Sequence, residues 1–200
     1  MAPISANCLR SACTSVDSPG LDVVETNLAG LLLLQPRVFE DRRGFLLESY
    51  NERSMAAVGI RAHFVQDNHS YSRHNVLRGM HYQIASSQGK LVRVVQGEIF
   101  DVAVDLRRSS GTFGKWFGVS LSGENKRMLW IPSGFAHGFH VRSDDAHVIY
   151  KATDFYAPKS ERTILWDDSD LAIAWQLAEP PMVSEKDAAG VRFRDAETFA

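Results

Sequence analysis

Ile99-Phe100-Asp101-Val102-Ala103-Val104-Asp105-Leu106 is the stretch that decides the fold class. Every even-numbered position in it is apolar, whereas the odd-numbered positions include two aspartates. An alternation with a period of two is typical of a β-strand, because successive side chains point to opposite faces of a sheet. The stretch therefore predicts a strand with one wholly apolar face.

Short apolar runs recur at intervals of roughly ten residues from Leu31 onward, separated by turn-forming residues, which is the spacing of an antiparallel sandwich or barrel. We expect further strands at residues 31–38, 45–49, 64–68, 91–96, 116–121, 128–131, 147–153, 163–166 and 171–175. Helix is scarce, because only residues 52–58 and a short segment capped by Ser184 have helical patterns. We predict an all-β antiparallel jelly roll with short peripheral helices, whose inner face encloses a ligand cavity.

The charge balance argues against several classes of partner. The chain has 22 basic and 24 acidic residues and a pI near 6.4, so no excess of positive charge is available to track nucleic acid. The longest apolar run, residues 28–34, is too short to span a membrane, and it follows Asp22 and Glu25 where a signal peptide would have basic residues. We therefore expect a cytoplasmic protein without nucleic-acid or membrane partners.

The N-terminal segment differs in composition from the remainder of the chain. Residues 1–20 are rich in small residues and end in Ser-Pro-Gly, which predicts a disordered tail ahead of a single domain over residues 21–200. Both cysteines, Cys8 and Cys13, lie in this tail without the His or Cys partners that a zinc site requires. We interpret them as incidental thiols.

The stretch Val76–Gln83, Val-Leu-Arg-Gly-Met-His-Tyr-Gln, places charged and polar residues inside an apolar, strand-like run. Because a buried Arg or His is costly unless it is paired, such residues tend to face a functional cavity; a satisfied structural histidine is the alternative. Straight alternation places Arg78 and His81 on opposite faces of the strand. We therefore predict a bulge or kink at Gly79 that lets both reach one cavity.

Other polar residues near the expected strands also suit ligand recognition. An Arg of the turn Asp41-Arg42-Arg43-Gly44 and Glu48 lie at the two ends of a strand and suit an anionic or hydroxylated ligand, unless they form a solvated turn with a surface acid. Gln66 and Asn68 share one face of a strand, as expected for recognition of hydroxyl groups or a base edge, unless this is simply a polar edge strand.

The later part of the chain adds candidates of the same kind. Lys90 starts an apolar strand, either as a snorkelling surface residue or as a cation held near the cavity. In residues 131–139 two glycines flank His137, which allows close backbone approach to a ligand; a hairpin loop with a structural histidine is the alternative. Tyr150 lies in an apolar strand and Tyr156 follows it, although a buried Tyr usually only hydrogen-bonds a neighbour.

The spacing of the histidines does not match a metal-binding jelly roll, in which two His at i and i+2 and a nearby acid point inward. Tyr82 and Gln83 follow His81, and His137 and His140 are three residues apart in an expected loop without an obvious carboxylate. We therefore favour a metal-free site in which His81 is a general base and a Tyr the general acid.

Taken together, these motifs resemble the dTDP-4-dehydrorhamnose 3,5-epimerase family, a metal-free branch of the cupin jelly rolls. The likeness runs from about residue 31 to residue 187 in matching order. It is carried by Phe39 with Asp41-Arg42-Arg43-Gly44 and Glu48, Gln66-Asp67-Asn68, Leu77-Arg78-Gly79-Met80-His81-Tyr82-Gln83, Lys90-Leu91, Asp101-Val102-Ala103-Val104-Asp105-Leu106-Arg107, Gly134-Phe135-Ala136-His137-Gly138-Phe139, Tyr150-Lys151 and Ser184-Glu185-Lys186-Asp187.

The resemblance implies an isomerase that needs no cofactor. A dTDP-4-keto-6-deoxyhexose would lose the protons at C5 and C3, each next to the C4 ketone, and regain them on the opposite face. By family position His81 would be the base and Tyr150 the acid. Asp187 would hold the tautomer of His81, although it also reads as an acid in the first turn of a capped helix. Lys90 would lie near the keto oxygen.

Further contacts follow from the same resemblance. Arg78 and His137 would join Lys90 near the keto oxygen. The remaining implied substrate contacts are Arg43, Glu48, Gln66 and Asn68 for the nucleotide, Tyr156 stacked on the thymine, Phe39 as an apolar wall and Glu161 as a polar contact. Family members are typically homodimers in which an N-terminal strand and some substrate contacts cross between subunits. The alternatives are a single-site 3- or 5-epimerase, a non-catalytic sugar-nucleotide-binding jelly roll and, less favoured, a metal-dependent cupin.

Overall fold

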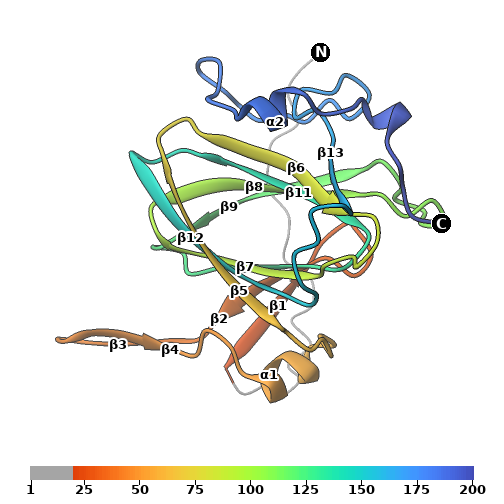
Figure 1. The fold of residues 1–200 in the computed structure, drawn as a ribbon. Helices are drawn as coiled ribbons and strands as arrows, with labels where there is room; N and C mark the ends of the chain where they lie inside the picture. The colour runs from red at the N-terminus through yellow and green to blue at the C-terminus, as the bar shows by residue number, and fades with distance from the viewer. Residues whose placement is uncertain (1–19) are drawn as a thin grey trace, which may run out of the picture.

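The computed structural model describes residues 20–200, and these form two antiparallel sheets packed face to face (Figure 1). The six-stranded sheet has the spatial order β1 (Leu21–Glu25), β2 (Leu32–Pro36), β10 (Met128–Ile131), β7 (Lys90–Gln96), β12 (Asp145–Ala152) and β5 (Gln66–Arg73). The five-stranded sheet has the order β13 (Glu161–Thr163), β6 (Leu77–Gln83), β11 (Phe135–Val141), β8 (Glu98–Asp105) and β9 (Trp116–Ser122). The all-β jelly roll predicted from the sequence is confirmed.

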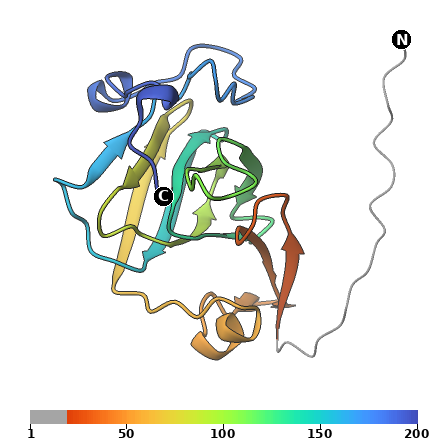
Figure 2. The same cartoon turned by 90° about the vertical axis from the view of Figure 1, so that its right-hand side faces the viewer.

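The remaining elements lie outside the two sheets. A separate hairpin of β3 (Val38–Asp41) and β4 (Gly44–Leu47) projects from the body of the molecule (Figure 1). Helix α1 (Glu52–Ala57) lies on one side of the sandwich, and the C-terminal segment with α2 (Glu185–Ala188) and the 3₁₀ helix η1 (Phe193–Asp195) covers the other (Figure 2). Both predicted helices are therefore present, and α2 begins at the predicted Ser184 cap.

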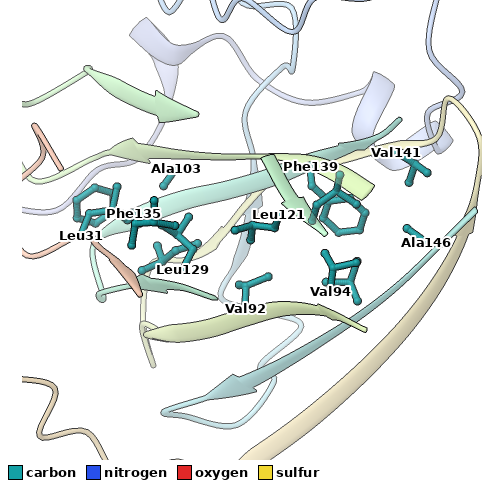
Figure 3. Packing of buried hydrophobic residues seen from close by; sticks show 14 of the residues in the cluster. Leu31, Val92, Val94, Ala103, Leu121, Leu129, Phe135, Phe139, Val141 and Ala146 are labelled. Atoms are coloured by element: carbon teal, nitrogen blue, oxygen red, sulfur yellow. The ribbon is translucent and has the colours of Figure 1, made fainter. Parts of the chain in front are cut away.

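Apolar side chains from both sheets fill the space between them (Figure 3). The buried residues of this inner cluster include Leu31, Val92, Val94, Ala103, Leu121, Leu129, Phe135, Phe139, Val141 and Ala146. Burying a side chain of this size stabilises the fold by about 1.5–3 kcal/mol. The inner cluster therefore holds the two sheets at a fixed separation, which in turn fixes the polar side chains that share these faces.

Strand β8 is buried on both faces, which the sequence pattern alone does not reveal. Its wholly apolar face, with Phe100, Val102 and Val104, packs under the C-terminal segment on the outside of the sandwich. The face that carries Asp101 points between the sheets, together with Ile99 and Ala103 of the inner cluster. The aspartate-bearing face is therefore the inner one.

The predicted bulge in β6 is confirmed. His137 of β11 pairs with His81, but Phe139 pairs with Arg78, so the interval between the two pairings contains one more residue in β6 than in β11. Gly79 has φ 120°, and a Cβ atom there would lie 2.6 Å from the Gly138 Cα. Only glycine satisfies both the dihedral angle and the close approach of the two strands.

Two predictions around β11 and the C-terminal segment are wrong. His137 and His140 lie in strand β11 and not in a loop, because Gly138 serves packing: a Cβ there would lie 2.7 Å from the Arg78 carbonyl oxygen. Residues 171–175 form no strand. Leu171 and Trp175 are instead buried from a loop against the outside of the five-stranded sheet, and the indole of Trp175 donates to the Trp166 carbonyl.

Several strand boundaries also differ from expectation. The run 31–38 divides into β2 and β3, β5 begins at Gln66 and continues to Arg73, and β13 ends at Thr163, before residue 166. The predicted tail, with Cys8 and Cys13, falls on residues 1–19, which are not described. Within residues 20–200, no helix is long and apolar enough to cross a membrane.

Candidate active site

His81 and Asp187, predicted to interact, are in contact. The Ser184 side chain accepts a hydrogen bond from the Asp187 backbone N–H at 3.1 Å and so starts helix α2 above the bulge of β6. Asp187 Oδ1 lies 2.5 Å from His81 Nε2, and Asp187 Oδ2 accepts the Gly79 N–H at 3.3 Å. The helix cap therefore places Asp187 in the position from which it contacts His81, so the two interpretations of Asp187 are compatible. The other ring nitrogen of His81, Nδ1, is not in contact with Asp187.

The environment of Asp187 favours its ionised form. Burial alone raises the pKa of this carboxyl, but the hydrogen bond from His81, the charge of His81 and the N–H of Gly79 outweigh burial and leave the pKa below its usual value. An ionised carboxylate accepts the Nε2–H of His81 and fixes the ring. His81 keeps 29 % of its side chain exposed, so it has access to solvent and to a ligand.

Tyr150 and Lys90 come from the opposite sheet. They lie on β12 and β7, on the faces that carry Val148 and Val92 of the inner cluster, and the Lys90 ammonium lies 5.9 Å from the centroid of the Tyr150 ring. Burial lowers the pKa of Lys90 to about 8, while the charges of Asp101 and Glu161 oppose this shift. Burial also raises the pKa of Tyr150, so its hydroxyl stays protonated at neutral pH.

A second His–Asp pair lies next to the first. His137 of β11 pairs with His81 in register, and its Nε2 lies 3.0 and 2.9 Å from the two carboxylate oxygens of Asp101 on β8. Asp101 was not among the predicted site residues, and its carboxylate is completely buried. The sequence did contain a signal for Asp101: it is an acidic residue in a strand whose other face is wholly apolar.

Glu161 joins two segments at the edge of the site. The Tyr156 hydroxyl donates to Glu161 Oε2 at 2.7 Å, and the Lys186 ammonium forms an ion pair with Glu161 Oε1. Burial raises the pKa of Glu161, but Lys186, Tyr156 and His81 together bring it below its usual value. Lys186 stands in the quoted Ser-Glu-Lys-Asp motif, yet the sequence reasoning assigned it no role.

The two predicted amides hold one another and the segment that carries Tyr156. Gln66 Nε2 donates to Asn68 Oδ1 at 3.0 Å, and Gln66 Oε1 accepts the Tyr156 N–H at 3.0 Å. Gln83, which was also missed, accepts the Ala157 N–H at 2.7 Å. A glutamine that ends a quoted, largely apolar motif was the signal for this role.

Arg78 links the two sheets at the open end of the site. Its Nε donates to the Ser72 hydroxyl at 2.9 Å, and its Nη2 donates to the Tyr71 carbonyl, so a guanidinium from β6 is held by β5 of the other sheet. The charge of Arg78 acts to lower the pKa of Tyr150, although burial dominates. The bulge breaks the alternation between Arg78 and His81, and that both residues act on one site stays a prediction.

Three predicted contacts do not lie with the others. Phe39 is exposed on the projecting hairpin, and Arg43 forms an exposed ion pair with Asp41 in the hairpin turn. Glu48 accepts hydrogen bonds from Asn51 and Ser54 at the start of α1. Within one chain these residues form a solvated turn and a helix cap, which was the alternative interpretation of their sequence.

The described residues also bear on metal binding. Between residues 20 and 200, no group of three or more His, Cys, Asp or Glu side chains is arranged to hold a metal ion. The two His–Asp pairs each present only one nitrogen beyond the carboxylate. The polar groups of the inner faces include His81, paired with Asp187, and the His137–Asp101 pair on one sheet, and Tyr150 with Lys90 on the other.

These features place the molecule among the cupin-like jelly-roll epimerases. The family model described as dTDP-4-dehydrorhamnose 3,5-epimerase matches residues 25–195. The chain is 58 % identical to the dTDP-4-dehydrorhamnose 3,5-epimerase of Pseudomonas aeruginosa over 84 % of this chain and 94 % of that protein. It is 54 % identical to the protein of the same name from Shigella flexneri over 90 % of this chain and 99 % of that one.

A solved structure agrees with the sequence comparison. The dTDP-6-deoxy-D-glucose-3,5-epimerase from Legionella pneumophila, in complex with dTDP-4-keto-L-rhamnose, superposes with a TM-score of 0.86 at 49 % identity, covering 88 % of this chain and 95 % of that one. The chain belongs to the dTDP-4-dehydrorhamnose 3,5-epimerase family.

Proposed function

We propose that this protein is a dTDP-4-dehydrorhamnose 3,5-epimerase, which converts dTDP-4-dehydro-6-deoxy-D-glucose into dTDP-4-dehydro-L-rhamnose. The observation that carries the proposal is the His81–Asp187 pair on one sheet with Tyr150 and Lys90 on the other. The names of the Pseudomonas and Shigella relatives support the reaction, and the ligand of the Legionella enzyme supports the substrate class.

In the proposed reaction His81 removes a proton from the carbon next to the ketone. The electron pair moves onto the keto oxygen, where the positive charge of Lys90 stabilises the enolate. Tyr150 then gives its proton to the opposite face of the same carbon. That the two residues lie on opposite sheets supports this division of roles, in which each residue would act on one face of the sugar and solvent would afterwards reset both groups.

The remaining residues of the site would bind the substrate. Gln66 and Asn68 present amide groups suited to the nucleotide, and Tyr156, held by Glu161, presents an exposed ring suited to stacking on a base. Arg78 and His137 would join Lys90 around the keto oxygen. No cofactor is required for this chemistry, because the ketone itself makes the neighbouring protons acidic.

We further propose that the protein is a homodimer in which Phe39, Arg43 and Glu48 contribute to the partner's site. The projecting hairpin exposes Phe39 and Leu46, the latter with 72 % of its surface accessible. The outer face of the six-stranded sheet has a cavity of about 160 Å³ lined in part by Leu91, Met128 and Ile149. Exposed apolar side chains such as those of the hairpin are typical of an interface between chains.

The dimer proposal is tested by mixing two inactive variants. Arg43→Ala removes a contact that the hairpin would supply, and His81→Ala removes the base. If the sites are shared, subunit exchange creates one intact site in each mixed dimer and restores about a quarter of the wild-type activity. A monomeric mass in light scattering, or no restoration after verified exchange, would contradict the proposal.

The reaction is tested by proton NMR of dTDP-4-keto-6-deoxyglucose incubated with the protein in deuterated water. Loss of signal at both C3 and C5 is the expected result, whereas loss at one position identifies a single-site epimerase. Binding without exchange by a folded protein identifies a non-catalytic binding module. Activity that chelation abolishes and a divalent ion restores would identify a metal-dependent cupin.

The cytoplasmic location of the protein remains a prediction.

A further inference from the structure

The carboxylate of Asp101 has no role in the reaction as described above, yet it is the most deeply buried charge of the site. Both of its oxygens lie within 3.0 Å of His137 Nε2, and it is completely buried. Among residues 20–200 no other side chain hydrogen-bonds this carboxylate. Asp101 therefore depends on His137 for its whole side-chain hydrogen bonding.

A buried carboxylate persists only where a nearby cation compensates its charge. The two candidates are the imidazole of His137 and the ammonium of Lys90, which projects from the opposite sheet. The Lys90 ammonium has no hydrogen-bond partner within the described part of the chain. Its protonation therefore depends on the surrounding charges, and the charge of Asp101 opposes the lowering of its pKa by burial.

The neighbouring strand β10, where Ile131 pairs with Lys90, contributes no charged or titratable group, but other elements of the site contribute several. They are Tyr150 on β12, Asp101 on β8, His137 on β11, His81 and Arg78 on β6, Glu161 on β13 and Asp187 and Lys186 on α2. Asp187 is paired with His81, and Glu161 is paired with Lys186. Asp101 differs from both of these carboxylates. Within residues 20–200, its partners are the groups that are proposed to stabilise the keto oxygen.

We propose that Asp101 is a positioning residue that orients His137 through its Nε2–H and helps to keep Lys90 positively charged next to the enolate oxygen. This inference rests on the proposed function. Asp101 lies behind the ring of His137 and acts through it, so it touches no reacting atom. With the carboxylate in place, Nε2 is the protonated nitrogen of His137, and Nδ1 is the nitrogen left for the substrate.

The first test uses Asp101→Asn, which keeps the size of the side chain but removes its charge. The midpoint of the Lys90 titration, followed by NMR of ¹³C-labelled lysine and assigned with Lys90→Arg, is expected to fall by about one pH unit from the wild-type value. The kcat is expected to decrease, with the alkaline limb of its pH profile shifted to lower pH and KM little changed. An unchanged Lys90 midpoint would overturn the proposal.

Asp105→Asn is the matched control, since Asp105 is also completely buried on β8 but binds Arg107, Ser110 and Thr112 instead. It is expected to reduce stability without moving the Lys90 midpoint. If both variants move the midpoint equally, the effect comes from the strand and not from Asp101, and the proposal fails.

A measurement on the wild-type protein covers the case in which Asp101→Asn does not fold. Long-range ¹H–¹⁵N spectra are expected to show that the Nε2 nitrogen of His137 carries a proton, because the carboxylate of Asp101 accepts that proton. A neutral ring protonated only at Nδ1 would overturn the proposal. These titrations do not depend on turnover, so they remain interpretable if deuterium exchange rejects the epimerase itself.

Discussion

The two His–Asp pairs of the site have the same chemical composition but different surroundings. His81 is partly exposed, and its carboxylate comes from helix α2 near the end of the chain. His137 is buried, and its carboxylate comes from the adjacent strand β8, inside the sandwich. An imidazole that exchanges protons needs access to solvent, whereas one that holds a fixed hydrogen-bond geometry needs a rigid enclosure. The difference is consistent with the proposed roles of His81 as the base and of His137 as a fixed contact to the substrate.

Replacing the exposed histidine is expected to have the largest effect. His81→Asn should lower kcat by about 10²–10⁴-fold, because general base catalysis contributes rate factors of that size. Binding of dTDP, measured by calorimetry, should change little. His74→Asn is the control, because its exposed ring contacts only the Ser143 carbonyl. Retained exchange at C3 and C5 in His81→Asn would reverse the assignment of the two pairs.

The group between the two pairs provides the pH prediction. Lys90 is cationic below its pKa of about 8, so stabilisation of the enolate is present below this pH and disappears as the pH rises through it. We expect an alkaline limb of kcat near pH 8. Lys90→Arg should move this limb to higher pH, since a guanidinium stays charged. Lys90→Met should lower kcat by about 10²–10³-fold below pH 8, and this loss should shrink as the pH rises and wild-type Lys90 loses its charge. An alkaline limb that Lys90→Arg leaves in place would assign it to another group.

The helix-borne carboxylate is expected to have a smaller effect than its histidine. Asp187→Asn should reduce kcat by about 10–100-fold, because the ring of His81 remains but loses the partner that fixes its tautomer and orientation. Ser184→Ala tests the helix cap that positions Asp187, and it should cost about 1 kcal/mol in unfolding free energy with a milder loss of rate. If Asp187→Asn keeps full activity, the contact is structural.

The weakest effect on activity is expected from Asp105, the second buried carboxylate of β8. Burial raises the pKa of Asp105, but hydrogen bonds from Arg107, Ser110 and Thr112 lower it to about 2. The carboxylate therefore stabilises the fold above the ordinary Asp pKa, and this contribution is lost as the pH falls to about 2. Asp105→Asn should cost about 1–3 kcal/mol by denaturant unfolding and flatten the acid dependence of stability in this window. A normal kcat in this variant would show that Asp105 contributes to stability and not to activity, unlike the role proposed for Asp101 on the same strand.

Much of the site was predictable from local sequence. The alternation in β8, the glycine between Arg78 and His81, and the Ser184 cap each have a local physical cause, and all three are confirmed. The assignments that failed depend on longer range. Gly138 suggested a loop because glycine favours turns, but here it admits the neighbouring strand β6. The apolar run 171–175 suggested a strand, but its large side chains are buried from a loop.

The sequence by itself determined the all-β class, the family and the residue types of the site, because periodicity, capping and motifs are properties of neighbouring residues. The tertiary structure alone decided which face of β8 is inner, and so placed Asp101 under His137. It also decided that Phe39, Arg43 and Glu48 lie apart from His81 within one chain. Sheet pairing and packing join residues that are far apart in the chain, and a pattern of neighbours contains no information about which distant partner covers each face.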